Sequence, residues 1–469
     1  MPPQMPPSKQ PLTVWLTVCA ALQPAPRLAV GGFLLERLWF ICIGSLSLEV
    51  LTIDNRDRLK KEANPQLVAF QRATKWLIVL GQTVGLMPVL GVLSKPPATI
   101  RQVWFKVLSF RFLYSVILGA SQTMIAVICV QRLFRASLSV KSISFVLFYS
   151  ASAATTILFI QAATKWPNLI QELPHYKLDE YVDPRIKIKC NVAITIFLAS
   201  AIVEHIFSLL SAYAATLSCS SDYGWIFYSR FIKYSFPWIA ELGLPDNFII
   251  RLTTQFLNIT ATLAWSYSDL FIVCISLYLS SILEGINNKL VKNKNKLQYS
   301  CSKFWVSMRE DYSRAAQLVR AFDDVTCVVV FASFATNLIF ICLQLYNLLS
   351  DGVRQKMNSK NCPNISQGPL GGYENVIYFT YSMVFVLFRY LSVSLVAARV
   401  HTSSQSLAPA LYGVPSSVYN VEVQRFLDQV QHDTVALSGL QFFYVTKSLV
   451  LTVAGTIFTY ELVLLQYGG

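Results

Sequence analysis

The chain has 469 residues, 54% of them hydrophobic and only 14% charged, with a mean hydropathy of +0.48. Soluble domains carry about 25% charged residues, so this composition excludes an ordinary water-soluble protein. The net charge of +14 is interpreted as a membrane-topology signal rather than a nucleic-acid-binding surface, because the basic residues lie between apolar segments. The 10 cysteines form no CxxC pair or Cys/His metal spacing, and the four histidines are scattered. We therefore expect no metal, no cofactor and no enzymatic activity.

Seven apolar runs reach the length of a membrane-crossing helix, about 20 residues. They lie at 112–131, 143–162, 191–218, 253–282, 324–350, 374–400 and 436–466. The sequence thus predicts an all-α integral membrane protein with seven transmembrane helices. Residues 1–60 are expected to form a cytoplasmic extension, and residues 61–469 the membrane domain.

An eighth apolar run, 76–93, differs from the others. Basic residues flank it on both sides, which places both of its ends in the cytoplasm. Gly85-Leu86-Met87-Pro88 lies inside it and would interrupt a helix. These features favour a re-entrant segment, while an ordinary crossing remains the alternative.

The basic segments 163–190 and 283–323 set the predicted orientation, since Lys and Arg collect in cytoplasmic loops. The N-terminus is then cytoplasmic and the C-terminus extracellular. Asn364-Ile365-Ser366 falls in an outside loop and predicts glycosylation at Asn364. The segments 283–323 and 401–435 are expected to continue helices into the cytoplasm.

The last apolar run ends in a distinctive pattern. Val463, Gln466 and Tyr467 share one face of a helix. This face suits a pore constriction, and equally a glutamine that bonds to a neighbouring helix.

Thr459-Tyr460, followed by Gln466 and an aromatic residue, resembles the terminal signature of insect gustatory receptors. That family usually ends the signature in Phe, where this chain has Tyr467. Similarity to the sugar-receptor branch extends to Glu461, Gly85-Leu86-Met87-Pro88 and Arg309-Glu310-Asp311-Tyr312.

The resemblance implies a non-selective cation channel opened by a mono- or disaccharide, in the plasma membrane of chemosensory neurons. It implies a homotetramer whose last helices line one central pore, with the gate at Val463, Gln466 and Tyr467. Co-assembly with related receptors is left open. A G-protein-coupled receptor, which needs the opposite orientation, and a sugar transporter remain the alternatives.

Polar and ionisable residues within spans are costly and therefore predict a ligand site. A sugar needs hydrogen-bonding groups and an aromatic face inside a partly apolar pocket. We expect an extracellular-facing pocket between the spans 191–218, 253–282, 324–350 and 374–400. Its predicted residues are Glu204, His205, Asn258, Trp265, Asp269, Gln344, Tyr346, Tyr378 and Ser382. The alternatives are a polar seam between helices and an ion pair of Arg389 with Asp269 or Glu204.

Overall fold

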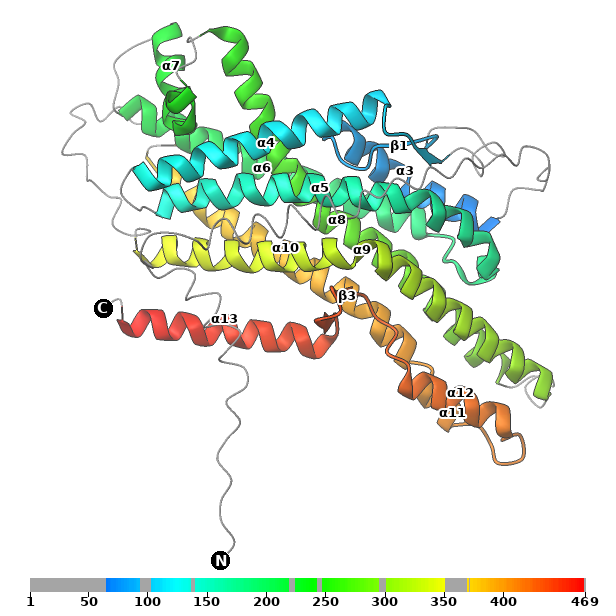
Figure 1. The fold of residues 1–469 in the computed structure, drawn as a ribbon. Coiled ribbons are helices and arrows are strands. Elements are labelled where there is room, and N and C mark those ends of the chain that lie inside the picture. The colour runs from blue at the N-terminus through cyan, green and yellow to red at the C-terminus, as the bar shows by residue number, and fades with distance from the viewer. Residues whose placement is uncertain are drawn as a thin grey trace, which may run out of the picture. The chain divides into compact units, whose positions relative to one another are not determined.

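A computed structural model describes residues 65–92, 103–135, 140–218, 224–242, 247–294, 301–350, 369–370 and 372–467 (Figure 1). These residues belong to one compact unit, Lys61–Gly469. The predicted cytoplasmic extension, residues 1–60, lies outside the described residues.

The described unit is built almost entirely from helices. The α-helices are α3 (Pro65–Thr83), α4 (Phe110–Arg135), α5 (Val140–Tyr176), α6 (Ile186–Ser218), α7 (Gly224–Ser235), α8 (Phe248–Asn293), α9 (Ser302–Ser350), α10 (Glu374–Gln405), α11 (Ala408–Tyr412), α12 (Val421–His432) and α13 (Lys447–Tyr467). Two short 3-10 helices are η2 (Asp179–Tyr181) and η3 (Pro237–Leu242). Two antiparallel strand pairs join β1 (Val89–Leu90) to β2 (Trp104–Phe105) and β3 (Ser438–Gly439) to β4 (Phe443–Tyr444).

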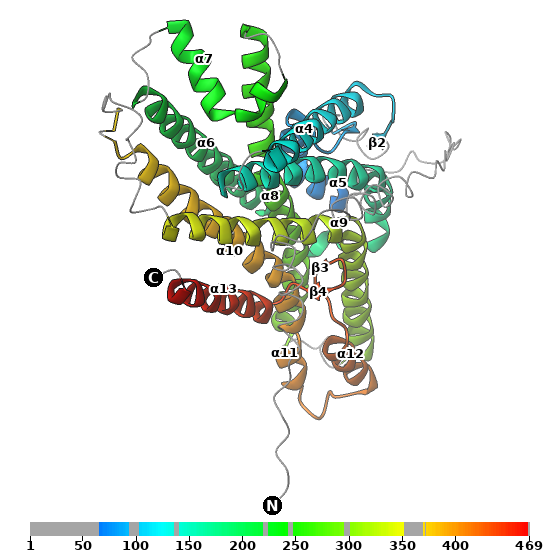
Figure 2. The same ribbon diagram turned by 60° about the vertical axis from the view of Figure 1, so that its left-hand side comes forward.

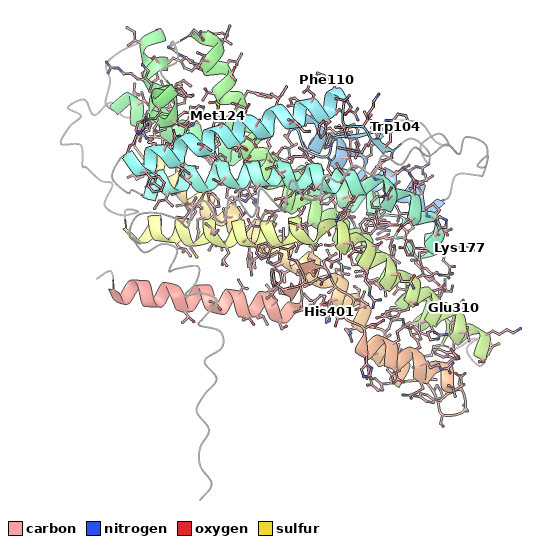
Figure 3. The ribbon with its side chains drawn as sticks, viewed as in Figure 1. Trp104, Phe110, Met124, Lys177, Glu310 and His401 are labelled. Atoms are coloured by element: carbon pink, nitrogen blue, oxygen red, sulfur yellow. The ribbon has the colours of Figure 1, made fainter. Side chains whose placement is uncertain are left out.

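Six described helices, α4, α5, α6, α8, α9 and α10, are long and apolar enough to cross a membrane. They correspond to the first six predicted runs. α8 lies at their centre, since 83% of its most apolar stretch is buried against 17% for α6 (Figure 2). On α4, Phe110 and Met124 point outward (Figure 3) and are largely exposed, as side chains that face lipid would be.

The start predicted for the seventh run, residue 436, is wrong. Residues 438–444 form the β3–β4 hairpin, and α13 begins only at Lys447. The Asp323 carboxylate of α9 accepts hydrogen bonds from the Ser438 backbone N–H and hydroxyl, both at 2.7 Å. Leu440 and Gln441 turn the chain with φ of 51° and 60°. Since α13 has 21 residues, it still has the length of a crossing helix.

The chain break predicted at residues 85–88 is confirmed. α3 ends at Thr83, and Gly85 and Met87 have φ of 77° and 50°. The carbonyl of Val89 accepts hydrogen bonds from Gln82 Nε2 at 2.7 Å and Arg111 Nη1 at 2.8 Å. Side-chain donors thus satisfy the backbone at this irregular segment, as burial in a membrane would require. α3 is not among the six long apolar helices, and its re-entry into the membrane stays a prediction.

The expectation that helices continue through much of 283–323 and 401–435 is confirmed, while their cytoplasmic location stays a prediction. α9 has 49 residues and is about 73 Å long at 1.5 Å per residue, more than twice the thickness of a bilayer core. Its first half packs with α12, where Arg309 Nε donates to Glu422 Oε2 at 3.0 Å (Figures 1 and 2). This hydrogen bond lowers the pKa of the Glu422 carboxyl.

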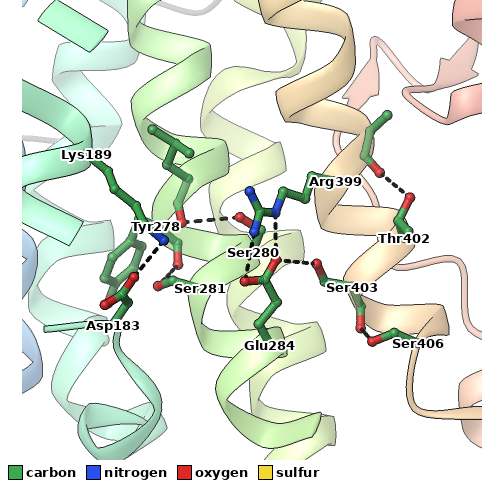
Figure 4. A network of polar contacts seen from close by, with 12 residues as sticks. Asp183, Lys189, Tyr278, Ser280, Ser281, Glu284, Arg399, Thr402, Ser403 and Ser406 are labelled. Atoms are coloured by element: carbon green, nitrogen blue, oxygen red, sulfur yellow. Dashed lines mark hydrogen bonds and ion pairs between the residues drawn. The ribbon is translucent and has the colours of Figure 1, made fainter. Parts of the chain in front are cut away.

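Polar contacts join the C-terminal parts of α8 and α10 and attach η2 to α8. Glu284 of α8 accepts two hydrogen bonds from Arg399 of α10, at 2.6 and 3.1 Å, and one from Ser403 (Figure 4). Lys289 donates to Glu180 at 2.6 Å and to the Tyr181 hydroxyl at 2.8 Å. The Lys289 hydrogen bond lowers the pKa of Glu180, while burial raises that of Tyr181. These contacts fix η2 and α10 against α8.

Two loops expected from the sequence are partly helical. α5 continues to Tyr176, well into the predicted cytoplasmic loop 163–190. The predicted outside loop 219–252 contains α7 and η3. Ile232 of α7, Trp238 of η3 and Phe236 between them are buried in a small hydrophobic core of their own with Tyr149 of α5. This amphipathic segment is too short to give a crossing signal, yet it buries enough apolar surface to fold.

Replacing Gly285 with Ala should destabilise the protein. A Cβ at Gly285 would lie 2.3 Å from the Tyr181 carbonyl oxygen, so α8 and η2 would have to separate. We expect a loss of about 1–3 kcal/mol, typical of overpacking, seen as a lower thermal midpoint of the detergent-purified protein. Gly455→Ala is the matched control because its Cβ would meet nothing within 4 Å. Equal midpoints for the two variants would contradict the close approach of α8 and η2.

Candidate functional site

A fully buried ion pair joins α8 to α10. Arg389 Nε and Nη2 donate to Asp269 Oδ2 at 2.8 and 2.5 Å, and both side chains are 0% exposed. Asp269 Oδ1 accepts from Ser333 Oγ and from Asn337 Nδ2 on α9. Of the two pairings considered for Arg389, the one with Asp269 is therefore present. All four hydrogen bonds on this carboxylate come from the protein, so Asp269 ties three helices together.

Trp265 lies one turn before Asp269 and belongs to the same cluster. The Arg389 guanidinium lies 4.1 Å from the Trp265 ring centroid, and the Phe340 ring lies 4.3 Å from it. Arg389 Nη2 also donates to the Trp265 carbonyl at 3.0 Å. The predicted aromatic platform is thus held in place by a cation and a second ring.

A second polar network connects α6, α9 and α10. Ser382 Oγ donates to Glu204 Oε1 at 2.6 Å, and Gln344 Nε2 donates to Ser382 Oγ at 3.0 Å. Glu204 is buried, and Tyr378 lies beside Glu204 and Ser382. Four residues predicted from separate parts of the sequence are therefore neighbours in space.

His205 and Asn258 contact different helices. His205 Nε2 lies 3.3 Å from Gln255 Nε2 of α8, so it faces the helix that carries Trp265. Asn258 Oδ1 accepts from Tyr149 of α5 at 3.4 Å. His205 therefore joins the predicted group, whereas Asn258 lies at its edge.

Several buried polar atoms in this region have no protein hydrogen-bond partner. They are Gln255 Oε1, Trp265 Nε1, Asn337 Oδ1, Gln344 Oε1 and Arg389 Nη1. Leaving such a group unpaired costs about 1–3 kcal/mol. The set contains both donors and acceptors, and a hydroxyl can pair with either kind. These groups match the chemistry of a polyhydroxylated, uncharged ligand, and its binding here stays a prediction.

The four helices expected to enclose the site, α6, α8, α9 and α10, do pack against one another. Tyr346, Val463, Gln466 and Tyr467 lie in helices whose backbone is described, but their side chains are outside the description. Asn364 lies outside the described residues. Sequence reasoning missed the Ser333 bond to Asp269, although Ser333 is one helical turn before Asn337.

Comparison with known proteins gives concordant matches. A family model described as trehalose receptor matches residues 53–469. The gustatory receptor for sugar taste 64f of Drosophila melanogaster is 28% identical over 421 residues, which cover 87% of this chain and 83% of that protein. The gustatory receptor 5a for trehalose, from the same species, is 28% identical over 414 residues, or 85% of each chain. The insect olfactory receptor OR5 from Machilis hrabei is similar in fold, with a TM-score of 0.59 at 14% identity over 86% of this chain and 100% of that one.

Replacing Arg389 with Met should destabilise the protein strongly, because Asp269 would remain buried without its partner. We expect a loss of about 3–5 kcal/mol, measured as a lower thermal midpoint of the purified protein. The double variant Arg389→Met/Asp269→Leu should recover most of this loss.

Arg399→Met is the control, because its ion pair with Glu284 is about half exposed and exposed pairs contribute at most about 1 kcal/mol. If Arg389→Met cost no more than Arg399→Met, Asp269 would not depend on Arg389.

Proposed function

The chain belongs to the trehalose receptor family, the sugar-receptor branch of the insect gustatory receptors, and on this premise we propose that it is a sugar-gated, non-selective cation channel. Family membership makes it a multi-pass membrane receptor and not an enzyme. The fold similar to an insect olfactory receptor argues against the G-protein-coupled alternative. The relatives are sugar-taste receptors, which supports a location in the plasma membrane of chemosensory neurons.

The ligand we propose is a mono- or disaccharide. The observation that carries this proposal is the buried network between α6, α8, α9 and α10, with unpaired donors and acceptors beside aromatic rings. A sugar is uncharged, so it needs hydrogen bonds and an aromatic face rather than a counter-charge. One relative is named for trehalose, and the network here has the chemistry that such a ligand requires.

In this proposal the two networks have different roles. Glu204, Gln344 and Ser382 would bind sugar hydroxyls, while Tyr378 and His205 would line the sides of the site. Asn258 and Tyr346 are proposed at its margin. Asp269 and Arg389 would hold Trp265 at the floor of the site. A sugar that displaces the Ser382–Glu204 hydrogen bond would separate the outer halves of α6 and α10.

We propose that α10 transmits this movement to the pore. α10 carries Ser382 and Arg389, and it also contacts α13. The outer part of α13 would carry the gate at Val463, Gln466 and Tyr467. Sugar need only bind the open state more tightly; shifting the open fraction from about 1% to 99% requires a preference of about 10⁴.

The tetramer is also a proposal, supported by the exposure of α13. Ser448, Thr452 and Thr459 are exposed along α13 and share one helical face with Val463 and Gln466. The Thr452 and Thr459 hydroxyls bond to the carbonyls four residues earlier, at 2.9 Å. An exposed face that carries hydroxyl groups suits a water-filled pore formed by four copies.

The decisive test is sugar-evoked current from this chain expressed alone. We expect at least one sugar in a panel of mono- and disaccharides, trehalose included, to open a cation current with a reversal potential near zero. If the protein is shown to be at the cell surface and no sugar in the panel evokes a current, the result would count against a homomeric channel. Recordings from excised patches without GTP distinguish a channel, which still responds, from a G-protein-coupled receptor.

Glu204→Gln should weaken the response to the active sugar. A hydrogen bond to a charged group contributes about 1.5–3 kcal/mol and one to a neutral group about 0.5–1.5 kcal/mol, so losing the charge removes about 1–1.5 kcal/mol. This corresponds to a rise of about 5- to 13-fold in the half-maximal sugar concentration. Surface expression should be unchanged, since glutamine can still accept from Ser382.

The matched control is Glu310→Gln. Glu310 is a carboxylate on the exposed surface of α9, near the end of that helix that begins at Ser302 (Figure 3). An unaltered half-maximal concentration in Glu204→Gln would remove Glu204 from the sugar site.

A further inference from the structure

A cavity of about 370 Å³ lies where α4 ends and α5 begins. Small-molecule sites typically measure about 300–1,000 Å³. In the predicted orientation this end of the helices is extracellular. The cavity is lined by Cys129 and Arg132 of α4, Ser142 and Phe145 of α5, Lys233 and Tyr234 of α7, and Pro237 and Trp238 of η3.

The walls of the cavity are well supported by packing. Trp238 is 4% exposed and packs edge-on against Tyr149, with ring centroids 6.1 Å apart. Arg132 Nη1 donates to the Pro237 carbonyl at 2.7 Å and so connects α4 to η3. The cavity therefore lies on the small outer core that α7 and η3 form with α4 and α5.

The charge of the lining is positive. Arg132 and Lys233 belong to it, and none of the lining residues that the structure describes is a carboxylate. Outside the lining, Glu241 lies 3.4 Å from Arg132 and 3.3 Å from Arg135, so a single carboxylate is shared by two guanidinium groups. The rim is accessible, because Lys233 and Tyr234 are exposed.

We propose that this cavity binds a small amphipathic anion. Its carboxylate or phosphate would lie between Arg132 and Lys233, and its apolar part between Phe145 and Trp238. Arg132 already donates to the Pro237 carbonyl and to Glu241, which holds its guanidinium in one orientation. The remaining N–H donors of Arg132 are therefore fixed in direction, which favours a carboxylate or phosphate. The site is separate from the polar networks of α6 to α10, where a neutral sugar is proposed. The anion is either a soluble organic acid or the headgroup of an outer-leaflet lipid.

The test uses the full-length protein in nanodiscs and phenyl phosphate as the probe. In phosphatidylcholine nanodiscs, phenyl phosphate should raise the thermal midpoint in a saturable way. Benzyl alcohol, which lacks the charge, and inorganic phosphate, which lacks the ring, should shift it much less at equal concentration. Equal shifts with benzyl alcohol, or no shift with phenyl phosphate, would overturn the proposal.

Variants locate the binding. Lys233→Gln should raise the apparent Kd about threefold to fivefold, the scale of one exposed ion pair. Arg230→Gln is the matched control, since it removes a cation from the same helix outside the lining. Ser142→Trp should fill the cavity and abolish the shift. A shift that persists in Ser142→Trp, or an equal effect of Arg230→Gln and Lys233→Gln, would assign the binding to another site.

Nanodiscs that contain phosphatidylglycerol distinguish the two sources. If the occupant is a lipid headgroup, the phenyl phosphate shift should disappear there while the basal midpoint of the protein rises. If the occupant is a soluble anion, the shift should be the same in both membranes. Either result supports an anion site, provided that phenyl phosphate raises the thermal midpoint in phosphatidylcholine nanodiscs.

Discussion

The arrangement of the inner helices depends on one interaction, the buried pair of Asp269 and Arg389. Both charges are fully withdrawn from solvent, and isolated charges in such surroundings are very costly. The pair is tolerated because Ser333 and Asn337 complete the hydrogen bonding of the carboxylate. This requirement fixes the register of α8, α9 and α10 relative to one another, in a membrane where apolar contacts alone provide little specificity.

The positions of the polar side chains in the proposed sugar site depend on this register of α8, α9 and α10. Trp265 is held by the same arginine, and Gln344 and Ser382 lie further along the two helices that Asp269 holds. Their hydrogen bond to each other, and that of Ser382 to Glu204, follow from helices that cannot slide. The ion pair thus acts as a structural support, whereas Glu204 and its neighbours have the chemistry of ligand contacts.

Much of this could be predicted from the sequence, because hydropathy and the cost of buried charge are strong signals in a membrane protein. The first six long apolar helices and the closeness of Glu204 to the polar residues Gln344 of α9 and Ser382 of α10 followed from them. The β3–β4 hairpin did not, because Gly439 is the one glycine beside the turn at Leu440 and Gln441, and a single glycine in an apolar run does not exclude a helix. Helix α7 was missed because 12 residues are too few for a crossing. The sequence left two partners open for Arg389, Asp269 and Glu204. Which of them it pairs with depends on how the helices are rotated relative to one another, and the sequence does not specify this rotation.

The hairpin has a mechanical consequence for α13. Asp323 of α9 accepts two hydrogen bonds from Ser438, and Leu437 and Val445 are fully buried. The N-terminal end of α13 is therefore attached to α9 at a fixed point. Beyond this point α13 rises for 21 residues, or about 31 Å. A rod held at one end moves most at the other, and tilting this helix by about 10° would displace its far end by about 5 Å, calculated from its rise per residue. A small rearrangement beside the base of α13 would thus become a movement comparable to the diameter of a hydrated ion at its tip.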